Sequence, residues 1–128
     1  MKTVLIIDDN TDYRISLVEI LQLESYLTLE AENGQLGLQM IRHHSPNLIV
    51  CDVDMPVMNG IEVLRTVKTD PIFASIPFLI ITGHRDEQTL KTSRALGVEA
   101  YLTKPITIPT FLSTIGHFLN ERTSTSPL

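Results

Sequence analysis

The sequence predicts an α/β fold in which five parallel strands alternate with five helices. Two patterns lead to this prediction. Short, continuously apolar runs rich in β-branched residues recur along the chain, and longer amphipathic segments lie between them. Continuous rather than alternating apolar runs are typical of parallel strands that helices cover on both faces. The length of 128 residues, 43% of them apolar, fits one domain with a substantial core.

Five segments have the character of strands. Residues 4–7, 48–50 and 78–81 are apolar throughout, as expected of central strands. Residues 26–31 and 98–102 are mixed in character, which suits the edges of a sheet. With these two at the edges, the strand order becomes 2-1-3-4-5, the flavodoxin-like arrangement. Ligands of such sheets bind beyond the carboxyl ends of the strands, at the switch point between strands one and three.

Five further segments have the apolar spacing of helices. The first is expected over residues 12–24. The other four begin near a capping residue or a glycine, namely Asn33, Gly60, Asp86 and Thr107. The chain turns polar after the last helix, so we expect one domain over residues 1–122 and a polar tail or the start of a linker over residues 123–128.

The composition argues against several classes of function. Ten basic against fifteen acidic residues give a net charge of −5, which disfavours a nucleic-acid-binding surface. No apolar run approaches the roughly 18 residues that span a membrane, and the N-terminal segment lacks the cleavage site of a signal peptide. The single cysteine, Cys51, can form no internal disulfide, which is compatible with the reducing cytoplasm where we expect the protein.

Charged and hydroxyl side chains stand at the carboxyl ends of four predicted strands. They are Asp8 and Asp9 after the first, Asp52 and Asp54 after the third, Thr82 after the fourth and Lys104 after the fifth. Because these ends meet at one edge of a parallel sheet, we expect the side chains to lie close together. Crowded carboxylates repel each other and need a compensating cation. Oxygen ligands without histidine or thiolate favour a hard cation, Mg²⁺ above all, for which Mn²⁺ could substitute.

Four stretches give the chain a resemblance to a known family. They are "IIDDN" at 6–10, "LIVCDVDMPVMNGIEVL" at 48–64, "PFLIITG" at 77–83 and "GVEAYLTKP" at 97–105. Over essentially its whole length the sequence resembles the receiver domains of response regulators in two-component signalling. The resemblance implies that a sensor histidine kinase or a histidine phosphotransfer protein phosphorylates Asp52. It also implies that Mg²⁺ is held by the side chains of Asp8, Asp9 and Asp52 and by the backbone carbonyl of Asp54.

The same resemblance implies a switch. Thr82 and Lys104 would contact oxygens of the phosphoryl group, and the rotamer of Tyr101 would follow Thr82. A cis peptide bond would precede Pro105. The surface of the fourth helix, fifth strand and fifth helix would then change its preference for a downstream protein or for a second copy of the chain. Such a protein catalyses its own phosphorylation and slow hydrolysis and is not a metabolic enzyme.

Two further side chains are candidates for tuning this chemistry. Asp54 is a less usual residue at its position in the family, and its side chain either points to solvent or alters the approach of water and donor. His84, two residues past Thr82, either stays idle in an exposed loop or orients a hydrolytic water. We hypothesise that both side chains tune the lifetime of the phosphate.

Two other functions compete with a receiver. Asp-x-Asp after an apolar strand also opens phosphatases of the haloacid dehalogenase type, but that interpretation leaves Asp8 and Asp9 unexplained and expects the motif on the first strand of a longer chain. A flavin- or nucleotide-binding module would carry glycine or hydroxyl residues after the first strand, where this chain has two acids. Because no DNA-binding segment accompanies the domain, we expect either a stand-alone receiver or a fragment of a longer regulator.

Overall fold

The computed structural model describes residues 1–120 and contains the predicted α/β fold. Five parallel strands form one sheet in the order β2-β1-β3-β4-β5, which confirms the flavodoxin-like order. The strands are β1 (Thr3–Ile7), β2 (Leu27–Ala31), β3 (Leu48–Cys51), β4 (Phe78–Thr82) and β5 (Ala100–Thr103). The helices of the described residues are α1 (Thr11–Leu23), α2 (Gly34–His44), α3 (Gly60–Lys68), α4 (Glu87–Ala95) and α5 (Ile108–Phe118). The predicted domain end at residue 122 and the tail over 123–128 lie outside the described residues.

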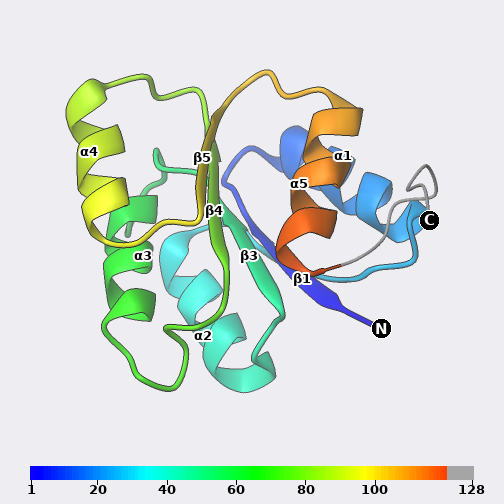
Figure 1. Cartoon of the computed structure of the whole chain (residues 1–128), viewed down its shortest axis with the longest axis horizontal. Coiled ribbons are helices and arrows are strands. Elements are labelled where there is room, and N and C mark those ends of the chain that lie inside the picture. The colour runs from blue at the N-terminus through cyan, green and yellow to red at the C-terminus, as the bar shows by residue number, and fades with distance from the viewer. Residues whose placement is uncertain (121–128) are drawn as a thin grey trace.

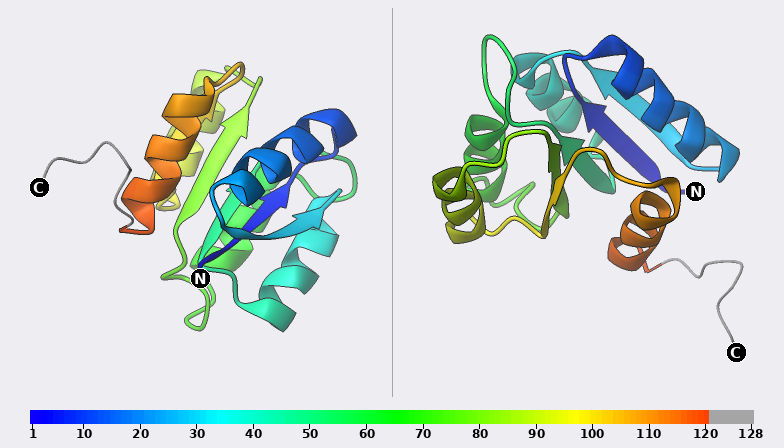
Figure 2. Two further views of the ribbon diagram at one scale, coloured as in Figure 1. Left: turned by 90° about the vertical axis from the view of Figure 1, so that its right-hand side faces the viewer. Right: turned by 90° about the horizontal axis from the view of Figure 1, so that it is seen from above.

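Two layers of helices enclose the sheet. α1 and α5 cover one face, and α2, α3 and α4 cover the other (Figure 1). The loops that lead from β4 to α4 and from β5 to α5 lie at the top of this view, and the right-hand view of Figure 2 looks down on them. Because all strands are parallel, this upper edge holds the carboxyl end of every strand.

Successive strand residues enter two different cores. In β1, Val4 and Ile6 pack in the core beneath α1 and α5, while Leu5 and Ile7 pack in the core beneath α2 and α3. All four side chains are fully buried. Side chains of a strand point alternately to opposite faces, so a strand covered on both faces is apolar at every position. β3 and β4 are buried at every position in the same way, whereas the edge strands β2 and β5 are only partly buried.

Side-chain caps determine where the helices begin. Three predicted caps are confirmed, because each side chain accepts a hydrogen bond from a backbone N–H of α2, α4 or α5: Asn33, Asp86 and Thr107. α1 begins at Thr11, one residue earlier than predicted, because the side chain of Asn10 accepts a hydrogen bond from the N–H of Tyr13. No helix within residues 1–120 is long and apolar enough to cross a membrane.

Gly60 lets α3 begin directly against the end of β3. Its N–H donates to the carbonyl of Val53 at 2.9 Å. A Cβ atom at this position would overlap the carbonyl oxygen of Asp52 and would lie 3.0 Å from Cα of Val53. A capping box between Asn59 and Glu62 closes the same helix start. The residue type at position 60 therefore determines how closely α3 approaches the backbone that carries Asp52.

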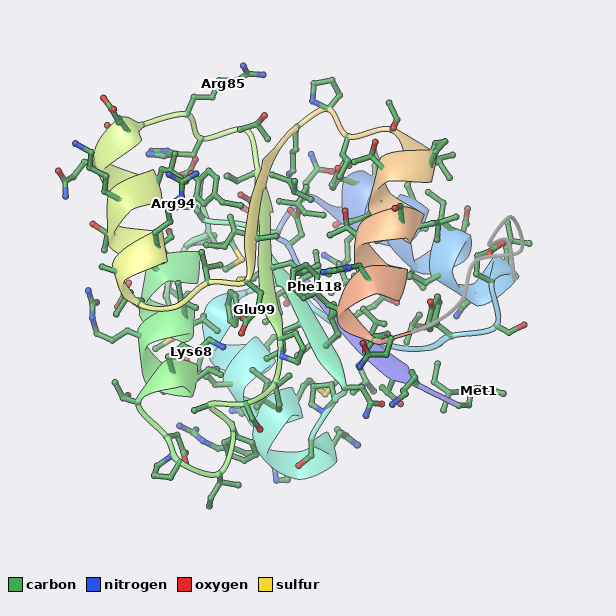
Figure 3. All side chains as sticks on the ribbon, viewed as in Figure 1. Met1, Lys68, Arg85, Arg94, Glu99 and Phe118 are labelled. Carbon is green, nitrogen blue, oxygen red and sulfur yellow. The ribbon has the colours of Figure 1, made fainter. Side chains whose placement is uncertain are left out.

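An ion pair lies at the amino ends of β4 and β5, opposite to the edge that holds the carboxyl ends of the strands. Lys68 of α3 and Glu99 lie side by side (Figure 3), with Nζ 2.9 Å from both carboxylate oxygens. The ammonium also donates to the carbonyls of Ala74 and Ile76, at 3.1 and 3.4 Å. The Glu99 carboxylate accepts the N–H of Phe78 at 2.7 Å. This network joins α3 and the loop that follows it to the amino ends of β4 and β5.

Candidate functional site

Four side chains that the sequence singled out meet at the carboxyl edge of the sheet. Asp8 follows β1, Asp52 follows β3, Thr82 ends β4 and Lys104 follows β5. The first three side chains belong to residues that are only 2%, 7% and 0% exposed. The structure therefore places two carboxylates and a hydroxyl in a largely desolvated setting, as the parallel topology predicted.

The ammonium of Lys104 lies between the two buried carboxylates. Nζ is 3.1 Å from Oδ2 of Asp8 and 3.1 Å from Oδ2 of Asp52. Burial by itself lowers the pKa of Lys104, but hydrogen bonds and charge from the two aspartates outweigh burial and raise that pKa above its ordinary value. Burial raises the pKa of Asp8, and hydrogen bonds from the Asn10 backbone and from Lys104 oppose the rise only in part. The lysine stays charged at neutral pH and offsets part of the repulsion between the aspartates.

Backbone donors hold the orientation of both carboxylates. Oδ1 of Asp52 accepts the N–H of Val53 at 2.6 Å and that of Asp54 at 3.4 Å, while its other oxygen faces the lysine. Oδ1 of Asp8 accepts the N–H of Asn10 at 2.9 Å. Each aspartate thus has one oxygen engaged by the main chain and one by the ammonium.

Asp8, Asp9 and Asp52 form a carboxylate group suited to a cation. One oxygen from each lies within 4.8 Å of the others. Asp9 is exposed, and no salt bridge of the described residues includes it. The one ammonium in this group, that of Lys104, pairs with Asp8 and Asp52, so the three acids carry excess negative charge. An all-oxygen donor set of this kind fits a hard divalent cation. The prediction that these acids lie together is confirmed.

The two residues predicted to form a switch both contact His84. Oγ1 of Thr82 accepts the N–H of His84 at 3.2 Å, and within residues 1–120 its own hydroxyl proton has no acceptor. The hydroxyl of Tyr101 donates to the carbonyl of His84 at 2.9 Å. Burial raises the pKa of Tyr101, so this hydroxyl remains a donor at neutral pH. One peptide segment thus connects the buried threonine to the aromatic side chain of β5.

The two side chains predicted to tune the site contact each other. Nδ1 of His84 is 3.1 Å from Oδ2 of Asp54. Nε2 of the same ring is 3.1 Å from Oγ1 of Thr89 and 4.0 Å from Oδ2 of Asp86. The Asp54 side chain is 66% exposed and that of His84 is 32% exposed. His84 therefore bridges the loop after β3 and the first turn of α4 instead of extending freely into solvent.

Two residues of α1 that sequence reasoning missed also contribute to the site. Nζ of Lys104 lies 4.3 Å from the ring centroid of Tyr13. Arg14 donates to the backbone carbonyl of Asp8 at 2.8 Å and to Oε1 of Glu30 at 3.0 Å, which ties α1 and β2 to the end of β1. The available signal was position, because both residues lie in the first turns of the helix that directly follows the acid pair.

The loops after β4 and β5 are also joined. The peptide bond between Lys104 and Pro105 is cis, as predicted. Arg85, at the top of Figure 3, donates to the carbonyl of Lys104 at 3.2 Å. The segment that carries His84 and the segment that carries the lysine therefore contact each other directly.

This sheet order, with buried aspartates after β1 and β3 and a lysine after β5, defines the class of signalling domains found in two-component response regulators. The sequence pattern of the response regulator receiver domain matches residues 4–116, and the chain belongs to that family. Proteins of this family are signalling proteins that interact with histidine kinases or phosphotransfer proteins.

Individual relatives agree with this assignment. The chain is 32% identical over 120 residues to the polar-differentiation response regulator DivK of Brucella anthropi. The matched region covers 94% of this chain and 98% of that protein. Its structure is similar to a CheY-like receiver domain protein of Methanospirillum hungatei, with a TM-score of 0.90, 28% identity and 94% of each chain covered. It is also similar to the chemotaxis protein CheY4 of Vibrio cholerae, with a TM-score of 0.86, 28% identity, and 92% of this chain and 98% of that chain covered. The predicted family is confirmed, and the family match gives no support to the phosphatase or the flavin-binding alternative.

Proposed function

We propose that a partner sensor histidine kinase or histidine phosphotransfer protein transiently phosphorylates Asp52, and that the phosphoryl group switches the surface formed by α4, β5 and α5. The observation that carries this proposal is the buried, oriented carboxylate of Asp52, 3.1 Å from the ammonium of Lys104. A P–O bond forms to a carboxylate oxygen while the P–N bond of the phosphohistidine breaks, and no proton has to leave the nucleophile. The chain then acts only on itself and is not a metabolic enzyme.

Four residues would hold Mg²⁺, or Mn²⁺ in its place. They are Asp8, Asp9 and Asp52 through their side chains and Asp54 through its backbone carbonyl. When bound, the cation supplies positive charge that screens the carboxylates from the phosphoryl oxygens. The group of three carboxylates, two of which pair with Lys104, supports this assignment.

Thermal unfolding with and without Mg²⁺ tests the metal site. At about ten times the dissociation constant, the cation should stabilise the domain by about 1.4 kcal/mol. Asp9→Asn should remove most of this gain, because it deletes an exposed ligand. Asp12→Asn is the matched control, since Asp12 is an exposed acid of the first turn of α1 that lies outside the carboxylate group. Equal Mg²⁺ responses of the two variants would contradict the assignment.

Lys104 and Thr82 would contact the phosphoryl oxygens. The ammonium already lies beside the acceptor carboxylate, so it can pair with an incoming oxygen after a small displacement. Thr82 has a hydroxyl proton to donate, because among residues 1–120 its oxygen is engaged only as an acceptor of the His84 N–H. Preorganised donors of this kind lower the barrier by stabilising charge that develops in the transition state.

Thr82 and Tyr101 would transmit the change to the surface. When Thr82 turns toward the phosphoryl group, it gives up its hydrogen bond with the N–H of His84, and the loop after β4 can shift. The carbonyl of the same histidine holds Tyr101, so the shift reaches β5 directly. A downstream protein or a second copy of the chain would then bind the altered α4-β5-α5 surface, with a coupling free energy of about 1–3 kcal/mol.

Asp54 and His84 would tune the lifetime of the phosphate as a pair. Both residues lie in loops that border the acceptor, one after β3 and one after β4, and their side chains contact each other at 3.1 Å. Dephosphorylation rates of the wild type, Asp54→Asn, His84→Ala and the double variant test this role. We expect each single variant to change the rate and the double variant to add little, because both remove the same contact. Unchanged rates in all three variants would sink the hypothesis.

Labelling with a small phosphodonor tests the central proposal. Full-length protein incubated with acetyl phosphate and Mg²⁺ should gain one phosphoryl group, detected by intact-mass spectrometry. Asp52→Asn should abolish the gain, whereas Asp54→Asn should retain it. Labelling of Asp52→Asn at the wild-type level would refute the assignment of the acceptor.

We further propose a cytoplasmic location, which the free, buried thiol of Cys51 supports.

A further inference from the structure

The ring of Tyr13 forms the third side of the lysine site. An ammonium has three N–H donors, and two sides of Lys104 are taken by the carboxylates of Asp8 and Asp52. Nζ also lies 4.3 Å from the centroid of the Tyr13 ring. A cation within about 6 Å of an aromatic face is attracted by the negative charge density of that face. The lysine is therefore held by two anions and by one neutral aromatic surface.

The hydroxyl of Tyr13 takes no part in this contact. Its oxygen is buried and has no hydrogen-bond partner within the described residues. Burial raises the pKa of Tyr13, so the ring is an uncharged phenol at neutral pH. A buried hydroxyl without a partner lowers stability, so the polar atom does not explain why a tyrosine stands here. The ring is the part of the side chain that the site uses.

Packing alone does not require an aromatic ring at this position. Tyr13 lies at the border of the core between the sheet and the α1–α5 layer, where it is partly buried. An aliphatic side chain could fill this border, but it would present no π face to the ammonium. Replacement of the ring by aliphatic side chains therefore separates the packing role from the contact with Lys104.

We propose that Tyr13 is a positioning residue for phosphoryl transfer, because its ring holds the Lys104 ammonium beside Asp52 without offering an acceptor that competes with the phosphoryl oxygens. A water molecule or an amide in the same place would accept a hydrogen bond from the lysine and would have to be displaced. The ring instead excludes water from that side and leaves the N–H donors to the carboxylates and to the incoming group. The inference rests on the proposed roles of Asp52 and Lys104.

The test compares full-length Tyr13→Phe, Tyr13→Leu and Tyr13→Met with the wild type. The readout is the initial rate of labelling by acetyl phosphate at saturating Mg²⁺, followed by intact-mass spectrometry. Tyr13→Phe keeps the ring and loses only the unpartnered hydroxyl, so its rate should stay within about twofold of the wild type, with equal or higher thermal stability. The two aliphatic variants should be slower by about fivefold or more. A Tyr13→Phe rate as low as the aliphatic ones, or aliphatic rates equal to the wild type, would overturn the proposal.

A second background separates positioning from a general effect on the fold. In Lys104→Met the ammonium is absent, so Tyr13→Leu should cause no further loss of labelling. The affinity for beryllofluoride with Mg²⁺, measured by calorimetry, gives a second readout that does not depend on the reaction rate, and the same pattern is expected. An equal loss in both backgrounds would show that the ring acts otherwise than through the lysine. Labelling that persists in Asp52→Asn would overturn the proposed function itself, whereas full labelling of Tyr13→Leu would overturn only this inference.

Discussion

Replacing Gly60 by alanine should destabilise the domain and disturb the backbone that carries Asp52. The added Cβ would overlap the carbonyl oxygen of Asp52, lie 2.9 Å from its carbonyl carbon and lie 3.0 Å from Cα of Val53. All three are backbone atoms, so no side-chain rotation can relieve the contact. Overpacking of this kind costs about 1–3 kcal/mol, and a rigid neighbour places the cost at the upper end. Alanine regains at most about 1 kcal/mol through its helix propensity, which leaves a net loss of about 2 kcal/mol.

Urea unfolding measures this loss. For a domain of this size, the dependence of the unfolding free energy on urea is about 1–3 kcal/mol per molar, so the midpoint should fall by about 1 M. Gly83→Ala is the matched control, because a Cβ at Gly83 would meet no atom within 4 Å and the residue has no positive φ. Its stability should stay within about 0.5 kcal/mol of the wild type. If Gly60→Ala proved as stable as the wild type, the close approach of α3 to the end of β3 would be refuted.

Two further contacts that lie away from the acceptor can be tested by substitution, the ion pair of Lys68 with Glu99 and the cap that Asp86 forms on α4. Lys68→Met should lower the free energy of unfolding by about 2–3 kcal/mol, because it leaves the Glu99 carboxylate without its cation. Adding Glu99→Gln should cost less than the sum of the single changes, and strictly additive losses in urea unfolding would show that the pair is not coupled. Hydrogen bonds from Thr89 lower the pKa of Asp86 in the folded state below its ordinary value of 3.8. The stabilisation that ionised Asp86 provides as the cap of α4 is therefore complete above pH 3.8. It is lost as the pH falls through the lower pKa of the folded state. The difference in unfolding free energy between the wild type and Asp86→Ala should therefore be constant above about pH 4 and should shrink as the pH falls further. A difference that stays equally large in strong acid would contradict this reasoning.

The strand order could be predicted because the burial of a strand determines which residue types it contains. A central parallel strand has two covered faces, so β3 is apolar at every position, and β1 and β4 are apolar except at one terminal threonine each, Thr3 and Thr82. The mixed segments that became β2 and β5 had to lie at the edges, where one side faces solvent. The helix starts at Asn33, Asp86 and Thr107 were equally readable, because capping depends on one side chain and the N–H groups that directly follow it.

The close backbone approaches at two glycines could not be predicted from the sequence. Judged by helix propensity, Gly37 inside α2 is only a weak point of about 1 kcal/mol. In the fold a Cβ at this position would lie 2.5 Å from Cδ1 of Ile7, so the glycine lets α2 approach β1 closely. Gly60 marks a helix start in the sequence, but only the fold shows how near it lies to the carbonyl of Asp52. Close approaches depend on partners distant in the chain, and no local pattern records them.

The sequence by itself determined which residues stand at the carboxyl edge of the sheet, since parallel strands must end side by side. Asp8, Asp52, Thr82 and Lys104 follow from that rule and from their types. The tertiary structure decided which atoms meet, because that depends on helix rotation, loop path and rotamers set by packing across the whole domain. Only there does His84 join the side chain of Asp54 to the backbone contacts of the switch residues. The same packing brings the ring of Tyr13 in α1, which no sequence motif singled out, against Lys104, the lysine that Asp8 and Asp52 share.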